Sequence, residues 1–275
     1  MDNYPLTQWR LVISGYAGGS SNMAVDEAIL EAVAAGESPP TLRFYGWRPA
    51  CLSLGYRQPS TVVDTDRCTA AGWDVVRRPT GGRAILHVDE LTYSVIAPAC
   101  EPRVKGSILE SYRRLSEALT AGLTMLGLTS FEALPDPGIT TPAGPACFDG
   151  PANYEITHAG RKLVGSAQVR KKNVVLQHGT LPLIGDVGRV AQALQFESHQ
   201  EQEQMAINLR RQATTLANAL GRDVTFEDAA VSLAAGFSQT LRLDLVEGHL
   251  SAFEMGRAGE LRSQKYATES WAQRR

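Results

Sequence analysis

The chain has 275 residues, with 27 basic and 29 acidic side chains and a formal net charge of −2. This balance argues against a nucleic-acid-binding protein, which carries an excess of Lys and Arg. No window approaches the roughly 20 consecutive apolar residues that span a bilayer, and the first residues lack the features of a signal peptide. We therefore expect a cytoplasmic globular protein that contacts neither nucleic acid nor membrane.

The first predicted elements are a helix and two strands. Residues 23–33 place apolar side chains at helical spacing, and this helix is expected to end at Gly36, because glycine commonly closes helices. Residues 41–47 and 50–55 alternate and are rich in strand formers. Since residues 47–49 have the composition of a turn, the two strands are predicted to form a β-hairpin.

Three more strands are predicted at residues 74–79, 83–87 and 91–97, with a turn at Gly81 and Gly82 between the first two. These strands follow one another without a regular helix between each. That order favours a mixed or antiparallel sheet over a fully parallel one.

A long helix is predicted at residues 105–126, where apolar side chains recur every three or four positions, and it should lie across the sheet. Residues 135–151 contain five prolines and three glycines, which predicts a loop longer than most connections. Loops of this length tend to be functional or disordered. Three further strands are expected at residues 154–157, 162–169 and 174–181.

The chain becomes helical towards its end, with candidate helices near residues 203–220, 225–240 and 250–266. No linker, repeat or low-complexity segment interrupts it. The simplest organisation is one α+β unit in which mixed, largely antiparallel sheets are flanked by helices. We expect a core over residues 1–220 and a C-terminal helical extension, residues 221–275, packed on that core.

The four cysteines are widely spaced and form no Cys-x-x-Cys pair, so neither a zinc site nor a disulfide framework is indicated. Cys51, Cys68 and Cys100 are interpreted as small buried hydrophobes. Cys147 differs because it lies among glycines and prolines, in a segment that cannot be a regular element. It is therefore a candidate nucleophile.

Residues 77–84 hold a pair of glycines, Gly81 and Gly82, flanked by arginines. Glycines let a backbone approach a ligand closely, and arginines recognise phosphates and carboxylates. A tight hairpin with surface arginines explains the pattern equally well. No Gly-Lys-Ser/Thr follows and no Gly-x-Gly-x-x-Gly is present, so neither a P-loop nor a Rossmann site is predicted.

Two side chains in predicted strands are candidates for the same site. His87 either lines the site or is a satisfied core histidine, and no histidine has metal-ligand spacing to another, so no metal is expected. Lys162 precedes a run of small residues that would leave a cleft above the strand. An ammonium group near the thiol of Cys147 would favour the thiolate and stabilise charge on an attacked carbonyl oxygen.

Taken in order, these segments resemble the lipoate–protein ligase and octanoyltransferase family, which shares its catalytic fold with the biotin–protein ligases. The resemblance covers most of the chain, and the order and spacing of its pieces are specific. The segments that carry it are residues 22–27, 42–47, 54–58, 77–87, 90–95 and 145–181, followed by Lys265, Tyr266 and Trp271 near the end.

The resemblance implies a catalytic core over residues 1–220 and a ping-pong transfer without a cofactor. In it, Cys147 takes octanoate from octanoyl-acyl carrier protein as a thioester, and Lys162 lowers the pKa of that cysteine. The acceptor would be one lysine of a lipoyl-domain protein, such as the H protein of glycine cleavage.

The resemblance also implies a substrate-binding set. Ile85, Leu163 and Val164 would line a slot for the acyl chain. The residues expected to bind the substrate are Arg78, Gly81, Gly82, His87, Gly165 and Ser166.

Three alternatives remain open within this resemblance. The chain would be an ATP-dependent lipoate–protein ligase, an amidotransferase that moves octanoyl or lipoyl groups between lipoyl domains, or a non-catalytic acyl-carrier-binding protein. Arg83 stands where ligases of the family commonly show a third glycine, which favours the transferase.

Overall fold

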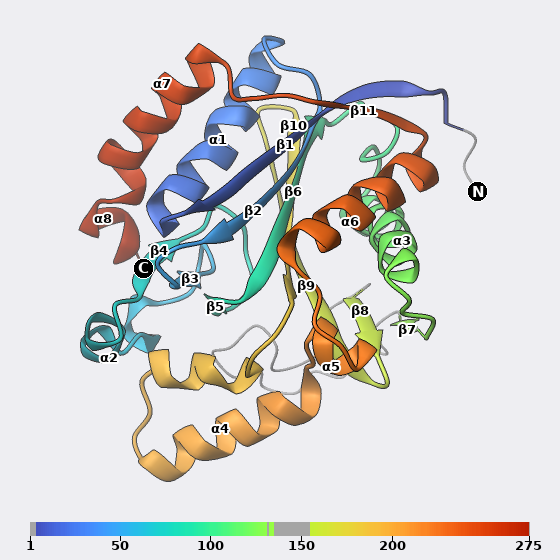
Figure 1. The fold of residues 1–275 in the computed structure, drawn as a ribbon. Coiled ribbons are helices and arrows are strands. Elements are labelled where there is room, and N and C mark those ends of the chain that lie inside the picture. The colour runs from blue at the N-terminus through green and yellow to red at the C-terminus, as the bar shows by residue number, and fades with distance from the viewer. Residues whose placement is uncertain (1–3, 131, 135–154, 275) are drawn as a thin grey trace.

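Two β-sheets form the framework of the computed structural model, which describes residues 4–130, 132–134 and 155–274 (Figure 1). The larger sheet has the strand order β11-β1-β2-β6-β10-β9-β8-β7, and the smaller has the order β4-β3-β5. The strands of the larger sheet are β1 (Thr7–Ala17), β2 (Thr41–Trp47), β6 (Glu90–Pro98), β7 (Glu132–Leu134), β8 (Glu155–His158), β9 (Arg161–Lys171), β10 (Val174–Pro182) and β11 (Leu243–Glu247). Those of the smaller sheet are β3 (Cys51–Leu54), β4 (Asp74–Arg77) and β5 (Ile85–His87).

The prediction of mixed, largely antiparallel sheets flanked by helices is confirmed. In the larger sheet, β1 pairs in parallel with β2 and with β11, whereas β6 and β10 pair antiparallel with their neighbours. The β9–β10 hairpin has its tip at Lys172 and Asn173, which both have positive φ. The strands predicted from this part of the sequence therefore pair as neighbours.

The hairpin predicted from residues 41–47 and 50–55 is wrong. β2 pairs with β1 and β6, while β3 pairs with β4 and β5 in the other sheet. Strand propensity identifies both strands, but it does not specify their partners, and each of them is buried along its whole length. Likewise, Gly81 and Gly82 do not join paired strands, because β3 lies between β4 and β5.

Strands β1 and β11 were not predicted. A bulge between Ile13 and Tyr16, with Gly15 in the left-handed region, breaks the alternation of β1. β11 is only five residues long and lies between two helices. Neither strand has the period-two pattern over enough residues to stand out in the sequence.

Helices cover both faces of the larger sheet (Figure 1). On one face lies α1 (Gly19–Ala35), which ends at Gly36 in the left-handed conformation, as predicted. On the other face α3 (Ile108–Met125) packs against α6 (Phe226–Leu241), and both contribute to the main hydrophobic core. The remaining α-helices are α2 (Thr65–Ala70), α4 (His199–Gln212), α5 (Leu216–Leu220), α7 (Ala252–Leu261) and α8 (Glu269–Ala272). Two 3-10 helices lie at Ser60–Val62 and Val187–Ala193, and a π-helical segment lies at Arg262–Tyr266.

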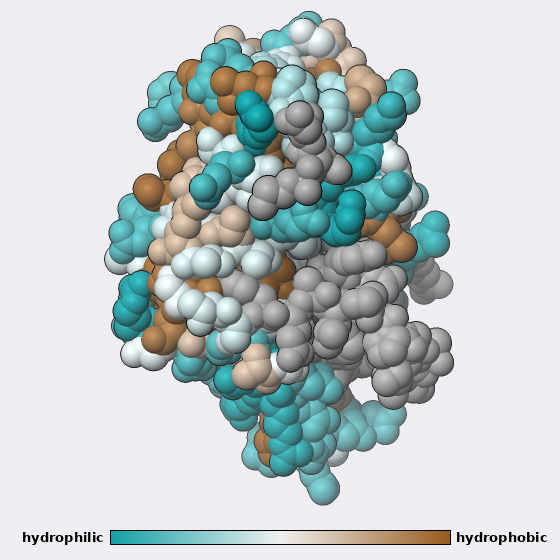
Figure 2. Space-filling model, turned by 90° about the vertical axis from the view of Figure 1, so that its right-hand side faces the viewer, coloured by the Kyte–Doolittle hydropathy of each residue, from teal (hydrophilic) through white to brown (hydrophobic). Residues whose placement is uncertain are grey.

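The single helix predicted over residues 203–220 is two helices, α4 and α5. The chain is extended at Ala213, which forms a β-bridge with Lys162, and the amide of Thr214 donates to the carbonyl oxygen of Lys162 at 2.9 Å. Pairing with β9 therefore interrupts the helical run. Figure 2 shows that the lower end of the molecule, where α4 lies in Figure 1, is covered by hydrophilic side chains.

The last part of the chain contributes to both faces of the larger sheet. α6 packs on α3, β11 extends the sheet beside β1, and α7 packs on α1. The division of the chain at residue 220 stays a prediction. None of the helices in the described residues has the length and apolarity needed to cross a membrane.

Glu27 of α1 attaches the C-terminal segment to the rest of the molecule. Its carboxylate accepts hydrogen bonds from Lys171 at 2.8 Å, Lys265 at 2.5 Å and the Tyr266 hydroxyl at 2.7 Å. Burial alone would raise the pKa of Glu27, but these three donors outweigh it and lower the pKa to about 2. The ionised carboxylate therefore stabilises the folded state.

We expect Glu27→Gln to lower the free energy of unfolding at pH 7 by about 2 kcal/mol, a value reduced for partial exposure to solvent. The folded pKa lies below the ordinary value, so the stabilisation is complete above about pH 4.5 and is lost as the pH falls towards 2. Urea unfolding of both proteins at several pH values measures this difference. It should narrow between pH 5 and pH 3, and a constant difference would contradict the role given to Glu27.

Candidate active site

A cavity lies between the two sheets. Its walls come from both sheets, from α1 and from the loop that contains Gly81 and Gly82 (the glycine loop), so that residues far apart in the sequence share one space. Most of the lining is apolar or aromatic, with a few polar groups, as is usual for small-molecule sites. The lining residues are Met23, Tyr45, Trp47, Ser53, Arg78, Gly82, Ile85, His87, Thr92, Gly165, Ser166, Ala167, His178, Gly179 and Thr180.

Small residues on β9 and β10 leave the space for this cavity. Gly165, Ser166 and Ala167 lie opposite Thr180, Gly179 and His178 in the antiparallel ladder. A Cβ atom at Gly179 would lie 2.6 Å from the carbonyl oxygen of Gly165, so a larger residue there would push the strands apart. The run of small residues after Lys162 therefore lines a cavity, as the sequence analysis predicts.

Arg78 supports the glycine loop from inside the protein. Its guanidinium group donates to the backbone and hydroxyl oxygens of Ser53 at 3.0 and 3.1 Å, to Gly81 O at 2.8 Å and to Arg83 O at 2.7 Å. The side chain is buried, which rules out the alternative of surface arginines for this residue. Its hydrogen bonds position the loop at the edge of the cavity.

Gly82 has φ +91°, a conformation that L side chains rarely adopt. Its carbonyl oxygen packs directly on Gly55, where an added Cβ atom would lie only 1.9 Å from it. Because both contacting groups are backbone, the contact cannot be relieved by rotating a side chain. Gly55 and Gly82 together therefore set the position of the loop.

We expect Gly55→Ala to lower the free energy of unfolding by about 1–3 kcal/mol, because the added methyl group overpacks a backbone contact. Gly256 in α7 is the matched control, because a Cβ atom there would meet nothing within 4 Å. Gly256→Ala should raise stability by about 0.5–1 kcal/mol through helix propensity. Urea unfolding measures both variants, and equal stability of Gly55→Ala and the wild type would contradict the assigned contact.

His87 lies in a buried hydrogen-bonded chain on one wall of the cavity. Its Nε2 atom is 2.7 Å from Ser53 Oγ, and its Nδ1 atom is 2.8 Å from Glu90 Oε1. The ring stacks on Trp47 with 4.0 Å between centroids. Thr92 also donates to Glu90, as does Thr180. Carboxylate, imidazole and hydroxyl groups are thus held in a fixed order beside the cavity.

His178 occupies the facing wall in a similar arrangement. Its Nδ1 atom is 3.3 Å from Asp26, and its Nε2 atom is 2.6 Å from the Thr80 hydroxyl. Burial lowers the pKa of His178, which favours the neutral ring at neutral pH. Burial also acts to raise the pKa of Asp26, but the charge of Arg43 at 2.7 Å and the contact with His178 lower it overall.

The two buried cysteines, Cys51 and Cys68, are not activated thiols. Burial raises the pKa of Cys51 well above its ordinary value and that of Cys68 to about 11. Both are buried, as predicted, whereas the prediction for Cys100 is wrong because this residue is exposed after the end of β6. Cys147, the candidate nucleophile, lies outside the described residues.

Lys162 is buried at the second position of β9, and Gly165 follows it by three residues, or about 10 Å of strand. It is not among the described residues that line the cavity. Leu163 and Val164, predicted to line an acyl slot, belong instead to the main hydrophobic core. Ile85, the third member of that prediction, does line the cavity.

The structure thus brings together five predicted substrate-binding residues, while Gly81 lines an adjacent groove. Within the described residues, no cluster of three His, Cys, Asp or Glu side chains is arranged to hold a metal ion. The predicted residues that share the cavity are Arg78, Gly82, His87, Gly165 and Ser166.

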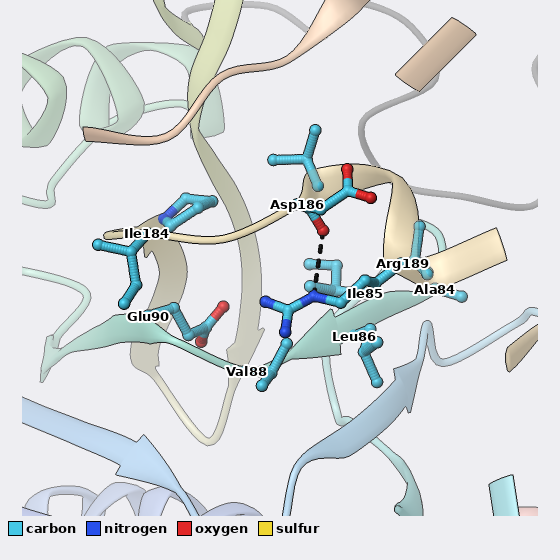
Figure 3. A pocket seen from close by; sticks show the side chains of 11 residues that line it. Ala84, Ile85, Leu86, Val88, Glu90, Ile184, Asp186 and Arg189 are labelled. Carbon is cyan, nitrogen blue, oxygen red and sulfur yellow. Dashed lines mark hydrogen bonds between the residues drawn. The ribbon is translucent and has the colours of Figure 1, made fainter. Parts of the chain in front are cut away.

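A second cavity adjoins the first at Ile85, on the edge strand β5, and Figure 3 shows its lining residues. Ile85 lines both cavities, so its side chain forms part of the wall between them. Figure 3 shows Ile184 and Asp186, on the segment after β10, among the side chains that line the second cavity. Arg189 donates there to the backbone oxygen of Asp186 at 3.3 Å.

Comparison with known proteins identifies relatives over nearly the whole length. The family model described as the lipoyl protein ligase A/B catalytic domain matches residues 19–238. The chain is 42% identical to octanoyltransferase LipM of Kyrpidia tusciae, covering 97% of this chain and 99% of the relative. It is 43% identical to octanoyltransferase LipM of Symbiobacterium thermophilum, with coverages of 98% and 99%.

Solved structures share the fold. The bi-partite lipoate protein ligase of Thermoplasma acidophilum, described together with its E2 lipoyl domain, superposes with a TM-score of 0.81 at 26% identity, covering 97% of this chain and 96% of its own. A lipoate-protein ligase A bound with ATP gives a TM-score of 0.80 at 26% identity, with coverages of 97% and 99%. A chain whose sequence relatives are named octanoyltransferases thus has the framework of lipoate–protein ligases, and the fold alone does not separate the two activities.

Proposed function

The chain belongs to the lipoyl protein ligase A/B catalytic domain family, and from this premise we propose that it is an octanoyltransferase. The observation that carries the proposal is its identity of 36–43% with octanoyltransferases over 96–98% of the chain. A largely apolar cavity between the two sheets supports it, since an acyl chain needs such a site.

The proposed donor is octanoyl-acyl carrier protein, and the proposed acceptor is a lysine of a lipoyl-domain protein such as the H protein of glycine cleavage. The acceptor class is supported by the archaeal neighbour, which is described with its E2 lipoyl domain. We place the reaction in the cytoplasm and assign the catalytic core to residues 1–220, with residues 221–275 as its extension.

The proposed reaction is a double displacement through Cys147. The thiolate attacks the carbonyl carbon of the octanoyl thioester, the bond to the carrier sulfur breaks, and the carrier leaves as a thiolate that takes up a proton from solvent. The neutral amine of the acceptor lysine then attacks the octanoyl-enzyme, an amide bond forms as the bond to the Cys147 sulfur breaks, the nitrogen gives up a proton to solvent, and Cys147 leaves as a thiolate. Both steps begin from a thioester, so neither ATP nor a cofactor is required.

Lys162 is proposed to act on both steps through its charge. An ammonium group beside Cys147 favours the thiolate, and the same charge disfavours protonation of the incoming amine, whose ordinary pKa is about 10.4. Burial of Lys162 supports this role, because a charge acts more strongly away from water.

The octanoyl chain is proposed to lie in the cavity between the sheets, near Ile85 and Trp47. Burying eight carbons at about 0.8 kcal/mol per methylene supplies several kcal/mol of binding free energy. Gly82, Gly165 and Ser166 would lie near the carbonyl group, while His87 and Arg78 hold the surrounding wall and loop.

The wall residue Ile85 should limit chain length. We expect Ile85→Ala to join the two cavities and to raise the ratio of decanoyl to octanoyl transfer by about tenfold, because two more methylenes can then be buried. Mass spectrometry of the acylated lipoyl domain, with an equal mixture of both donors, measures the ratio. Val88 lines only the second cavity, so Val88→Ala is the control; an unchanged ratio in Ile85→Ala would contradict the assigned wall.

Three donor mixtures separate the proposed function from its rivals. Wild-type protein and an unmodified lipoyl domain are incubated with octanoyl-acyl carrier protein, with an octanoyl-lipoyl domain, or with octanoate and ATP. We expect the first mixture to give the product fastest. Faster transfer from the octanoyl-lipoyl domain would identify an amidotransferase, strict dependence on ATP a ligase, and no product in any mixture a non-catalytic protein.

A further inference from the structure

An open groove of about 1630 Å³ leads along the surface to the glycine loop. Gly82 lines both this groove and the cavity between the sheets, so the two spaces meet at that residue. The groove is bordered by α1, by the β9–β10 hairpin and by the C-terminal segment. Its lining residues are Glu27, Leu30, Tyr56, Arg57, Pro79, Gly81, Gly82, Ile108, Gln168, Val169, Arg170, Lys171, Leu176, Lys265, Trp271 and Arg274.

The groove is strongly positive. Its lining includes five cationic side chains against the single carboxylate of Glu27, which leaves a net charge of +4. Glu27 stays ionised, since its pKa is lowered to about 2, and it pairs with Lys171 and Lys265. Among the described residues, neither Arg57 nor Arg274 forms an ion pair with a carboxylate, and both are exposed. Their charges are therefore available to an anion.

The C-terminal side of the groove is held in place by Arg77. This buried guanidinium group donates to the backbone oxygens of Trp271 at 3.1 Å and Ala272 at 2.8 Å, and to Gly55 O at 2.8 Å. In return, the Trp271 indole donates to Arg77 O at 2.9 Å. One side chain thus joins the C-terminal segment to the residues beneath the glycine loop.

This attachment places Arg274 at the border of the groove that Arg57 also lines. The guanidinium group of Arg274 lies 4.8 Å from the centre of the Tyr56 ring, and Arg57 follows Tyr56 in the chain. Arg274 also lies over Trp271, at 5.5 Å. Both arginines line this one groove without a carboxylate partner among the described residues, and arginine is well suited to binding phosphate through several N–H groups.

We propose that this groove, through Arg57 and Arg274, binds the phosphate of the donor's phosphopantetheine arm and the acidic surface of the carrier protein to which the arm is attached. The inference rests on the proposed function, because it takes the octanoyl thioester to lie at Gly82. The phosphate lies at the opposite end of the arm from the thioester, so a positive groove that ends at the acyl cavity matches the order of groups along the donor.

The test compares two octanoyl thioesters, octanoyl-acyl carrier protein and octanoyl-pantetheine, which lacks the phosphate and the protein. In the double variant Arg57→Glu/Arg274→Glu, we expect the ratio of KM for the carrier to KM for pantetheine to rise by about tenfold or more relative to wild type. Arg211→Glu, an exposed charge reversal on α4 outside the groove, is the control. The KM of the wild type for the carrier should also rise with ionic strength, and that of the double variant should not.

Octanoyl-coenzyme A distinguishes the free phosphopantetheine arm from the protein-bound arm. A KM ratio between carrier and coenzyme A that rises in the double variant supports contact with the carrier itself. An unchanged ratio between carrier and pantetheine would overturn the inference, as would an equal loss with both thioesters. Failure of the wild type to accept an octanoyl group from any of the three donors would instead contradict the proposed function.

Discussion

Replacing Cys147 with serine is expected to lower the rate of octanoyl transfer from acyl carrier protein by about a thousandfold or more. The thiolate is the attacking species, and a thiol ionises far more readily than a serine hydroxyl at neutral pH. The rate is measured as octanoylated lipoyl domain formed at saturating donor. This is the largest effect we expect, because both displacement steps depend on the same sulfur atom.

Cys100→Ser is the matched control for this substitution. Cys100 is the exposed cysteine among those that the structure describes, so it tests whether any accessible thiol supports the reaction. The control should transfer octanoate at the wild-type rate. If Cys147→Ser retained activity within tenfold of the wild type while Cys100→Ser lost it, the nucleophile would have been assigned to the wrong residue.

The second large effect is expected at Lys162. Lys162→Met, which keeps most of the side-chain volume but removes the charge, should slow transfer by about a hundredfold or more. The rate with iodoacetamide gives a second readout, because only the thiolate is alkylated. The pH midpoint for alkylation of Cys147 should rise in Lys162→Met, since the thiol loses the nearby positive charge.

Lys172→Met provides the comparison for Lys162. Lys172 lies at the tip of the β9–β10 hairpin and pairs with Glu31 on the surface, away from the cavity. It should change neither the rate nor the alkylation midpoint. Loss of activity in Lys162→Met without any shift in the midpoint would assign Lys162 to substrate binding alone, and full activity would remove it from the mechanism.

The sequence predicts most elements of the fold but not which strands belong to which sheet. The positions of β2 and β3 follow from composition and alternation, yet the predicted hairpin fails because the chain leaves one sheet after Trp47 and enters the other at Cys51. The composition of the short turn between Trp47 and Cys51 does not indicate that the chain passes from one sheet to the other there. The break between α4 and α5 has the same origin, since pairing of Ala213 with Lys162 overrides a continuous helical pattern.

For the candidate site, the predicted residues near Gly82 and Gly165 do meet at one cavity, whereas several of their neighbours were missed. Three of these neighbours come from strands that are distant in sequence, namely Ser53, Glu90 and His178. The sequence does not indicate that their polar side chains are buried and hydrogen-bonded beside the cavity, because most of their partners lie on other elements of the fold. Of these three residues, Glu90 is the one whose role the sequence could have indicated. It is an acidic residue at the start of a buried strand and lies three residues after His87, which is a suitable position for a hydrogen-bond partner of that histidine.

In the proposed reaction the chain carries octanoate as a thioester on Cys147 and needs no ATP. Wild-type protein is mixed with octanoyl-acyl carrier protein in the absence of nucleotide and acceptor, and its intact mass and peptides are measured. We predict one octanoyl group per chain, removable by hydroxylamine and located on the peptide that contains Cys147. An unmodified protein, or an octanoyl group on any other residue, would contradict the account.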